Sequence, residues 1–306
     1  MKNLFSIESL TAAEIRQIVA LGSEMKANRG RLSRHPLRHR CWGMIFLKSS
    51  TRTRVSFEVG IRELGGDPLF LSASELQLGR GEPIEDTARV LGRMLHGAVI
   101  RTFAQQDVEE FARLSGLPTV NALTDAEHPC QIVADLLTIQ EKLGTWAGKK
   151  VCYLGDGACN VPASWLWAAA RLGDFELVIG APPKYQPGAD LLARLGPGAN
   201  VRCEADPSAA VEGADVLYTD VWVSMGMEAD AGERLQDLAG YGIDADLLAR
   251  ARPGALVMHC LPAYRGKEIT AEVLETHAET IFTQAENRLH VQKAVLSLLA
   301  DGQAAG

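Results

Sequence analysis

Residues 42–64, Trp42-Gly-Met-Ile-Phe-Leu47 followed by Lys48-Ser-Ser-Thr-Arg-Thr-Arg54 and Val55-Ser-Phe-Glu-Val-Gly-Ile-Arg-Glu-Leu64, decide the fold. The first part is a short apolar run, which is typical of a buried strand. The last part has apolar residues at helical spacing and is followed by two glycines, which end helices. A strand, a polar loop and an amphipathic helix form the repeating step of a parallel sheet covered by helices.

The same step recurs along the chain. Strands are expected at 42–47, 68–71, 98–103, 119–122, 150–154, 176–179, 200–203, 215–219 and 255–260. A first helix is expected after a capping box formed by Thr11 and Glu14. Further helices are expected at 54–64, 84–95, 108–114, 130–143, 161–172, 189–195, 208–212, 270–276 and 286–299.

This alternation predicts an α/β protein with two doubly wound parallel-sheet domains. We place the first domain at residues 1–133, with a C-terminal helix at 286–306 packing back on it, and the second at residues 134–285. Interdomain helices are expected to join them, the long helix that ends near Leu143 among them.

The composition is that of a folded chain. Of the 306 residues, 47% are hydrophobic and 23% are charged, which excludes a disordered protein. No apolar run approaches the roughly 20 residues of a membrane-spanning helix. The first residues, MKNLFSIESL, lack the apolar core of a secretory signal. We therefore expect a cytoplasmic protein that binds no membrane.

Charge is unevenly distributed. The net charge of −7 argues against a nucleic-acid partner, yet residues 25–55 hold nine Lys or Arg and no Asp or Glu. Part of this region can be a solvated basic face, and a local basic site in an acidic chain fits a small anionic ligand. The six cysteines form no C-x-x-C pair, so no structural zinc site or disulfide framework is expected.

The polar loop at residues 48–54 lies where parallel sheets bind ligands, between the carboxyl end of a strand and a helix. Hydroxyls and guanidinium groups at a helix start favour an anion, and they suit the oxygens of a phosphate. A capped helix start with exposed arginines is the alternative interpretation. It explains one hydroxyl and leaves the run from Ser50 to Arg54 unexplained.

Ser50-Thr51-Arg52-Thr53-Arg54 resembles the carbamoyl-phosphate loop of the aspartate and ornithine carbamoyltransferases. Further signatures follow in the family's order over nearly the whole chain. Residues 77–83 resemble a loop that reaches a neighbouring subunit's site, and residues 128–131 resemble a turn that recognises the carbamoyl group. The resemblance makes the first domain the carbamoyl-phosphate domain. It implies that the residues binding carbamoyl phosphate are Ser50, Thr51, Arg52, Thr53, Gln77, Arg101, His128, Pro129, Cys130, Gln131, Cys260, Leu261 and Arg288.

Five of these residues have roles that general chemistry also supports. Arg101 and His128, together with Thr53, would donate hydrogen bonds to the carbonyl oxygen, which gains negative charge when it is attacked. Gln131 and the Leu261 carbonyl would accept from the carbamoyl NH₂ group. Taken alone, His128 would be a satisfied histidine at a helix start, and Arg288 would be a surface charge.

The second domain would choose the acceptor. Asp220-Val-Trp-Val-Ser-Met-Gly226 and His259-Cys-Leu-Pro262 each follow a strand, and both resemble loops of the ornithine-type members. Cys260, paired with Asp220, would orient an amine and help remove its proton. Taken alone, Asp220 could be a turn cap and Cys260 an inert buried thiol. The resemblance implies that ornithine is bound by Asn160, Asp220, Ser224 and Met225, and that catalysis falls to Arg101, His128, Asp220 and Cys260.

The implied activity is transfer of the carbamoyl group of carbamoyl phosphate to the δ-amine of L-ornithine, which gives L-citrulline and phosphate, in arginine metabolism and most simply in its biosynthesis. No metal and no organic cofactor is needed. Relatives acting on putrescine or acylated ornithine are the nearest alternatives. The family also implies a homotrimer, or a multiple of trimers, in which Gln77 completes the adjacent subunit's site.

Two other function classes stay open at this point. Gly155-Asp156-Gly157 follows a predicted strand and is the start of a dinucleotide fingerprint, although Asn160 replaces its third glycine. A nicotinamide-dependent oxidoreductase would explain that segment and leave residues 50–54, 128–131 and 259–262 without a role. A protein that binds ornithine or phosphate without catalysis is the third class.

Overall fold

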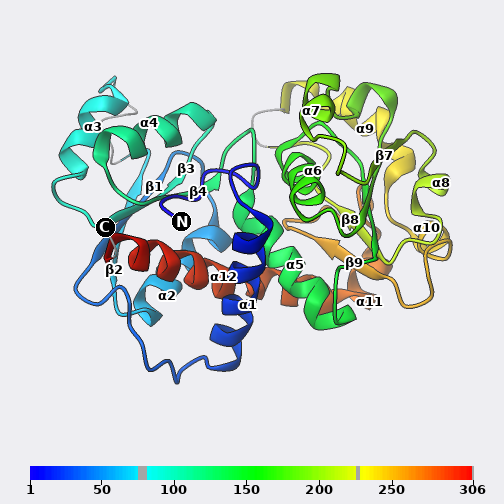
Figure 1. Cartoon of the computed structure of the whole chain (residues 1–306). Coiled ribbons are helices and arrows are strands. Elements are labelled where there is room, and N and C mark those ends of the chain that lie inside the picture. The colour runs from blue at the N-terminus through cyan, green and yellow to red at the C-terminus, as the bar shows by residue number, and fades with distance from the viewer. Residues whose placement is uncertain (75–80, 225–227, 305–306) are drawn as a thin grey trace. The chain divides into compact units, whose positions relative to one another are not determined.

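The structure, a computed structural model, describes residues 1–74, 81–224 and 228–304, which form two compact units (Figure 1). Unit 1 consists of Met1–Leu137 and Glu286–Gly306, and unit 2 of Thr138–Ala285. Each unit is built around a sheet whose strands all pair in parallel. Helices α5 and α12 each continue from one unit into the other along the chain. The predicted class, two parallel-sheet α/β domains joined by helices, is confirmed.

The sheet of unit 1 has four strands in the order β2-β1-β3-β4. Their bounds are Asp67–Ser72 for β2, Cys41–Phe46 for β1, Gly97–Arg101 for β3 and Thr119–Leu123 for β4. The helices are α1 (Ala12–Ala27), α2 (Thr51–Glu63), α3 (Ile84–Leu91), α4 (Gln105–Ser115), α5 (Pro129–Leu143) and α12 (Ala278–Ala304).

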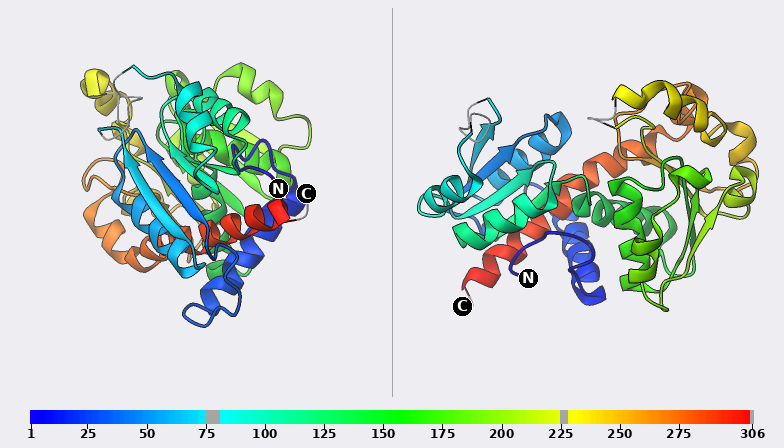
Figure 2. Two further views of the ribbon diagram at one scale, coloured as in Figure 1. Left: turned by 90° about the vertical axis from the view of Figure 1, so that its left-hand side faces the viewer. Right: turned by 90° about the horizontal axis from the view of Figure 1, so that it is seen from above.

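Helices cover both faces of this sheet (Figure 2). On one face, α3 and α4 bury Ala88 and Phe111 against Ile45 and Ile100 of the strands. On the other face lie α2 and α12. These two helices touch at Gly60, where a Cβ atom would lie 3.3 Å from the Lys293 side chain.

The sheet of unit 2 has five strands in the order β7-β6-β5-β8-β9. Their bounds are Val201–Glu204 for β7, Glu176–Gly180 for β6, Lys150–Leu154 for β5, Val216–Thr219 for β8 and Leu256–His259 for β9. The helices are α6 (Asn160–Leu172), α7 (Ala189–Arg194), α8 (Pro207–Val211), α9 (Ala231–Asp237), α10 (Ala245–Leu248) and α11 (Ala271–Thr276).

Two apolar layers pack against this second sheet. In the first layer, β5 and β8 pack on α8, α10 and α11 through residues such as Leu217, Val211 and Val273. The second layer is aromatic. The Trp165 ring of α6 meets the Tyr218 ring edge-on, with centroids 5.8 Å apart, and Tyr218 stacks on Tyr153 of β5 at 5.9 Å.

Each sheet reverses its strand order at one position, between β1 and β3 in unit 1 and between β5 and β8 in unit 2. In open parallel sheets this switch point, at the carboxyl ends of the strands, is where ligands bind. The polar loops that follow β1, β3, β5 and β8 therefore lie where a site is expected.

Some elements differ from their predicted bounds. Helix α2 begins at Thr51, earlier than predicted, because the Ser50 side chain caps it by accepting from the Thr53 N–H at 3.3 Å. Helix α12 begins at Ala278 rather than at residue 286, and the sequence does not predict α9 or α10. The Thr11–Glu14 capping box of α1 is confirmed. Over residues 1–74, 81–224 and 228–304, none of the helices has the length and apolar character needed to cross a bilayer.

Candidate functional site

The start of α2 carries the predicted phosphate-binding residues of unit 1. Ser50 is the cap, Thr51 and Arg52 are exposed in the first turn, and Thr53 is buried. The dipole and the first N–H groups of a helix favour an anion at such a position. The Arg54 guanidinium is engaged elsewhere, since it lies 3.8 Å from the centroid of the Phe70 ring and 3.5 Å from the Glu58 carboxylate.

A buried guanidinium connects three of the predicted residues. Arg288 of α12 donates from Nη1 to Gln131 Oε1 at 2.7 Å and from Nη2 to Thr53 Oγ1 at 3.4 Å. Its Nη1 also lies 3.3 Å from His128 Nε2. A guanidinium has donors only, so His128 accepts at Nε2 and carries its proton on Nδ1. Residues distant in the sequence thus form one polar cluster.

Burial and charge keep His128 neutral. Burial lowers the pKa of His128 well below its usual value, and the positive charges of Arg288 and Arg101 act in the same direction. Arg101 is the last residue of β3 and is also buried. Two guanidinium groups beside an uncharged imidazole suit a ligand that joins an anionic phosphate to a neutral carbamoyl group.

The first turn of α5 contains a thiol, that of Cys130, which is not available to a ligand. The Cys130 side chain is fully buried and donates to the Asn121 carbonyl at 3.5 Å. Burial raises the pKa of Cys130 to about 12, so the thiol stays protonated. Pro129 begins the helix, and a contribution of Cys130 to a donor site would come from its backbone.

Lys48 is a residue of this region that the sequence does not single out. Its side chain is buried, its Nζ pairs with the Asp125 carboxylate, and it lies 4.1 Å from the centroid of the Phe103 ring. Asp125 follows β4 and Phe103 follows β3, so one ammonium joins three loops at the carboxyl edge of the sheet. The signal for Lys48 is its position two residues before the cap of α2.

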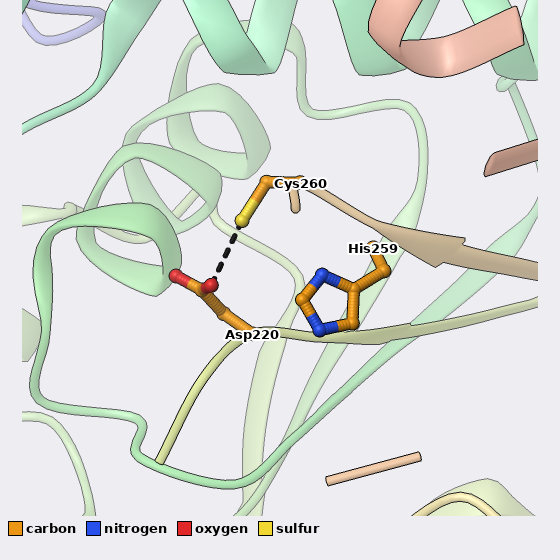
Figure 3. Close-up of side chains that lie close together, drawn as sticks. All are labelled: Asp220, His259 and Cys260. Carbon is orange, nitrogen blue, oxygen red and sulfur yellow. Dashed lines mark hydrogen bonds between the residues drawn. The ribbon is translucent and has the colours of Figure 1, made fainter. Parts of the chain in front are cut away.

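In unit 2 a thiol and a carboxylate form a hydrogen-bonded pair. The Cys260 Sγ donates to Asp220 Oδ1 at 2.9 Å (Figure 3). Asp220 follows β8 and Cys260 follows β9, the neighbouring strand. Burial raises the pKa of Asp220, while the electrostatic influence of the neighbouring His259 and the Cys260 hydrogen bond oppose that rise. A carboxylate held in the interior in this way is suited to bind a cation.

His259 holds the turn on which Cys260 lies. Its Nδ1 accepts from the Leu261 N–H at 2.9 Å, so Nε2 carries the proton and donates to Glu268 Oε1 at 3.2 Å. Leu261 has a left-handed φ of 60°, a conformation that costs a non-glycine residue about 1–2 kcal/mol. The hydrogen bond to His259 stabilises that conformation.

Donor atoms of Asp220, His259 and Cys260 lie within 4.8 Å of one another, which is close enough to hold a metal ion. However, both ring nitrogens of His259 already form hydrogen bonds, and the Cys260 thiol is directed at Asp220. These hydrogen bonds leave a thiol directly beside a carboxylate, an arrangement suited to proton transfer.

Two further predicted acceptor residues, Asn160 and Ser224, lie at the switch point of unit 2. Asn160 is the first residue of α6, which follows β5, and Ser224 lies in the loop after β8. Both are partly exposed. Met225, and Gln77 of unit 1, fall outside the described residues.

The two glycines that suggest a dinucleotide site have packing roles. Gly155 has a φ of 123°, and a Cβ on Gly157 would lie 2.5 Å from Ile179 Cγ2. Asp156 between them pairs with Arg234 of α9. These contacts explain why glycine and aspartate stand at these positions, and no nucleotide is needed to explain them.

The chain resembles known proteins along its length. Residues 2–141 match the carbamoyl-P binding domain of aspartate/ornithine carbamoyltransferase, and residues 147–299 match its Asp/Orn binding domain. The ornithine carbamoyltransferase of Akkermansia muciniphila is 58% identical over 305 residues, which cover 99% of either chain. That of Methanoculleus marisnigri is 49% identical and covers 99% of this chain and 98% of its own.

Solved structures agree with these sequence matches. The anabolic ornithine carbamoyltransferase of Campylobacter jejuni has a TM-score of 0.93 at 39% identity and covers 99% of this chain and 100% of its own. The ornithine carbamoyltransferase of Pyrococcus furiosus has a TM-score of 0.92 at 41% identity, with coverages of 98% and 97%.

Proposed function

Since the chain belongs to the aspartate/ornithine carbamoyltransferase family, we propose that it transfers the carbamoyl group of carbamoyl phosphate to the δ-amine of L-ornithine. The observation that carries the choice of acceptor is the hydrogen-bonded pair of the partly buried Cys260 and the buried Asp220. A carboxylate there attracts a diamino acid that arrives as a cation and repels the second carboxylate of aspartate. The names of the relatives above support the same choice.

The acceptor must lose a proton before it reacts. A free δ-amine has a pKa near that of lysine, about 10.4, so it enters as an ammonium. Asp220 binds the α-ammonium group of ornithine, and the pair of Asp220 and Cys260 orients the δ-nitrogen and helps remove its proton. Asn160 and Ser224 bind the remaining polar groups of the amino acid.

The neutral δ-nitrogen then attacks the carbamoyl carbon. The new C–N bond forms, the carbonyl oxygen becomes an oxyanion, and the C–O bond to phosphate breaks as the second nitrogen proton passes to the leaving phosphate. Arg101, His128 and Thr53 donate to the oxyanion, while Arg52 and the start of α2 hold the phosphate. Because His128 is neutral, Arg101 supplies the positive charge at the oxyanion.

A carbamoylation assay that offers four acceptors side by side tests the proposal. With carbamoyl phosphate saturating, L-ornithine should give citrulline at a rate far above those with putrescine, N-acetylornithine and L-aspartate. A higher kcat/KM for any of the other three would overturn the assignment of the acceptor.

The family context extends the proposal to assembly and role. We place the enzyme in the cytoplasm as a homotrimer, or a multiple of trimers, that serves arginine biosynthesis, and the anabolic relative from Campylobacter jejuni supports that role. Gln77 would complete the site of the adjacent subunit. Mixed trimers of Arg52→Ala and Gln77→Ala subunits should then recover part of the activity that each variant loses, and the absence of recovery in verified mixed trimers would count against a shared site.

The Arg52→Ala variant should bind carbamoyl phosphate and inorganic phosphate about ten- to a hundredfold more weakly, because it loses a charge-assisted hydrogen bond at the helix start. Isothermal calorimetry with phosphate measures the change. The matched control is Arg54→Ala, two residues on in the same turn, whose guanidinium contacts Phe70 and Glu58 instead. Equal losses in the two variants would remove the specific phosphate role of Arg52.

The Cys260→Ser variant should lower kcat by about 10²-fold and change its pH profile, because a hydroxyl is a far weaker acid than a thiol. Rates measured from pH 6 to 10 at saturating substrates would show the change. Cys203→Ser is the control, since that partly buried thiol lies on the edge strand β7 of the same unit. A Cys260→Ser profile like that of the wild type would exclude the thiol from proton transfer.

A further inference from the structure

Arg234 of α9 joins two loops of unit 2 that carry the proposed ornithine residues. Its Nε donates to the Trp222 carbonyl at 2.7 Å, and its Nη2 pairs with Asp156 Oδ2. Trp222 lies midway between Asp220 and Ser224 in the loop after β8. Fixing its carbonyl therefore restrains both residues at once.

The partner carboxylate does the same for the other loop. Asp156 Oδ1 accepts from the Ala158 N–H at 3.0 Å, two residues before Asn160 at the start of α6. One carboxylate thus receives the guanidinium on one oxygen and shapes the β5–α6 turn with the other. The two loops leave adjacent strands at the switch point of the sheet.

The pair is sheltered from water. The side chains of Arg234 and Asp156 are 12% and 5% exposed, and the guanidinium also lies 5.0 Å from the centroid of the Tyr185 ring. An ion pair in such surroundings is little screened, and removing one partner leaves a buried charge uncompensated. Arginine suits this position because its planar fork serves the carbonyl and the carboxylate together, which a lysine ammonium does less well.

We propose that Arg234 and Asp156 are positioning residues for the amino-acid acceptor, holding Asp220 and Ser224 in register with Asn160. This inference rests on the proposed function and adds specificity determinants that contact no substrate themselves. It implies that binding of the acceptor depends on a guanidinium that acts through the two loops it joins.

Steady-state kinetics of three variants test the inference, with carbamoyl phosphate saturating. Arg234→Gln and Asp156→Asn should each raise the KM for ornithine about ten- to a hundredfold, as misplaced positioning groups do, with a much smaller change in kcat. Arg234→Lys should fall between the wild type and Arg234→Gln. The KM for carbamoyl phosphate should stay near that of the wild type.

The double variant Arg234→Gln/Asp156→Asn gives a sharper readout. If the two residues act as one unit, its ornithine KM should resemble that of the worse single variant rather than the product of both effects. A merely structural role would lower the folded fraction and the apparent kcat while leaving the KM unchanged. Should Arg234→Gln fail to fold, Arg234→Lys carries the same test.

The matched control is Glu233→Gln, next to Arg234 on α9, which breaks an exposed ion pair with Lys184. This variant should leave the ornithine KM unchanged. An unchanged ornithine KM in folded Arg234→Gln and Arg234→Lys, or multiplicative effects in the double variant, would overturn the inference. A wild-type protein that makes no citrulline would instead overturn the proposed function, so the two failures are distinguishable.

Discussion

Arg288→Met is expected to lower kcat/KM for carbamoyl phosphate by about 10²–10³-fold, the range measured when a preorganised donor is removed from an oxyanion site. The guanidinium of Arg288 contacts Gln131 and Thr53 at 2.7 and 3.4 Å and His128 at 3.3 Å. Without it, the three side chains lose their common donor. Steady-state kinetics with carbamoyl phosphate varied would measure the loss.

The same variant should change the protonation of His128. Burial is the largest cause that lowers the pKa of His128, and the Arg288 charge is the second. Removing that charge should therefore raise the pKa of His128, though burial should still hold it below its ordinary value. A titration of the imidazole by NMR would follow the shift.

Lys293→Met is the matched control, because it also removes a buried cation from α12. Lys293 donates to Glu63 at 2.6 Å and is fully buried, but its ion pair links α12 to the far end of α2. We expect a lower melting temperature and near-normal kinetics of the folded fraction. Equal losses of turnover in the two variants would mean that Arg288 acts through helix packing.

The fold could be predicted because its central strands are buried on both faces. All five residues of β3 are buried, and such strands form apolar runs that alternate with helices. The start of α2 was harder to predict: Thr51 and Arg52 are ordinary loop residues by composition, and only the capping contact of Ser50 with Thr53 makes them the first helical turn.

Long-range polar contacts could not be predicted in the same way. Lys48 and Asp125 are 77 positions apart, and Arg234 and Asp156 are 78 apart. Local periodicity carries no information on such pairs, because it depends on neighbours three or four residues away. Arg234 also lies on a short helix without a legible apolar stripe.

The cysteines show the same limit at the site. Cys130 and Cys260 both fall within predicted site motifs, and composition does not distinguish them. In the structure, Cys130 is fully buried and has its pKa raised to about 12, whereas Cys260 is only partly buried and donates to Asp220. Tertiary packing, which the sequence pattern does not contain, separates a structural thiol from a candidate catalytic one.

Asp220→Asn is expected to lower kcat/KM for ornithine by about 10³-fold while the affinity for carbamoyl phosphate stays near that of the wild type. The amide keeps the shape of the side chain but loses the charge that attracts the ammonium, and it cannot help to remove a proton from the amine. Steady-state kinetics with ornithine varied, together with calorimetry for carbamoyl phosphate, would separate the two effects.

Asp215→Asn is the matched control, since Asp215 and Asp220 are 7% and 8% exposed and flank the same strand, β8. Asp215 accepts from the Lys150 N–H at 2.8 Å and lies 3.2 Å from the Arg252 guanidinium. Its loss should lower the melting temperature and leave the kinetics of the folded fraction unchanged. A large rise in the ornithine KM of Asp215→Asn would show that the assay reports the stability of the unit rather than the chemistry of its site.

Without substrates, Asp220→Asn should not share that loss of stability. Burial raises the pKa of Asp220, so between its unfolded value, about 3.9, and its folded value the native state binds more protons, and stability falls as the pH rises through this window. The amide removes this dependence, so the free energy of unfolding of the variant should increase relative to that of the wild type as the pH rises above about 4.

Saturating ornithine and phosphate should make the wild type the more stable of the two proteins, because a ligand that binds the native state stabilises it and the variant binds ornithine weakly. Denaturant titrations at several pH values, with and without ligands, would measure both effects. A variant less stable than the wild type at every pH would mean that the Asp220 carboxylate supports the fold, and the case for a carboxylate kept in the interior for its acceptor would be lost.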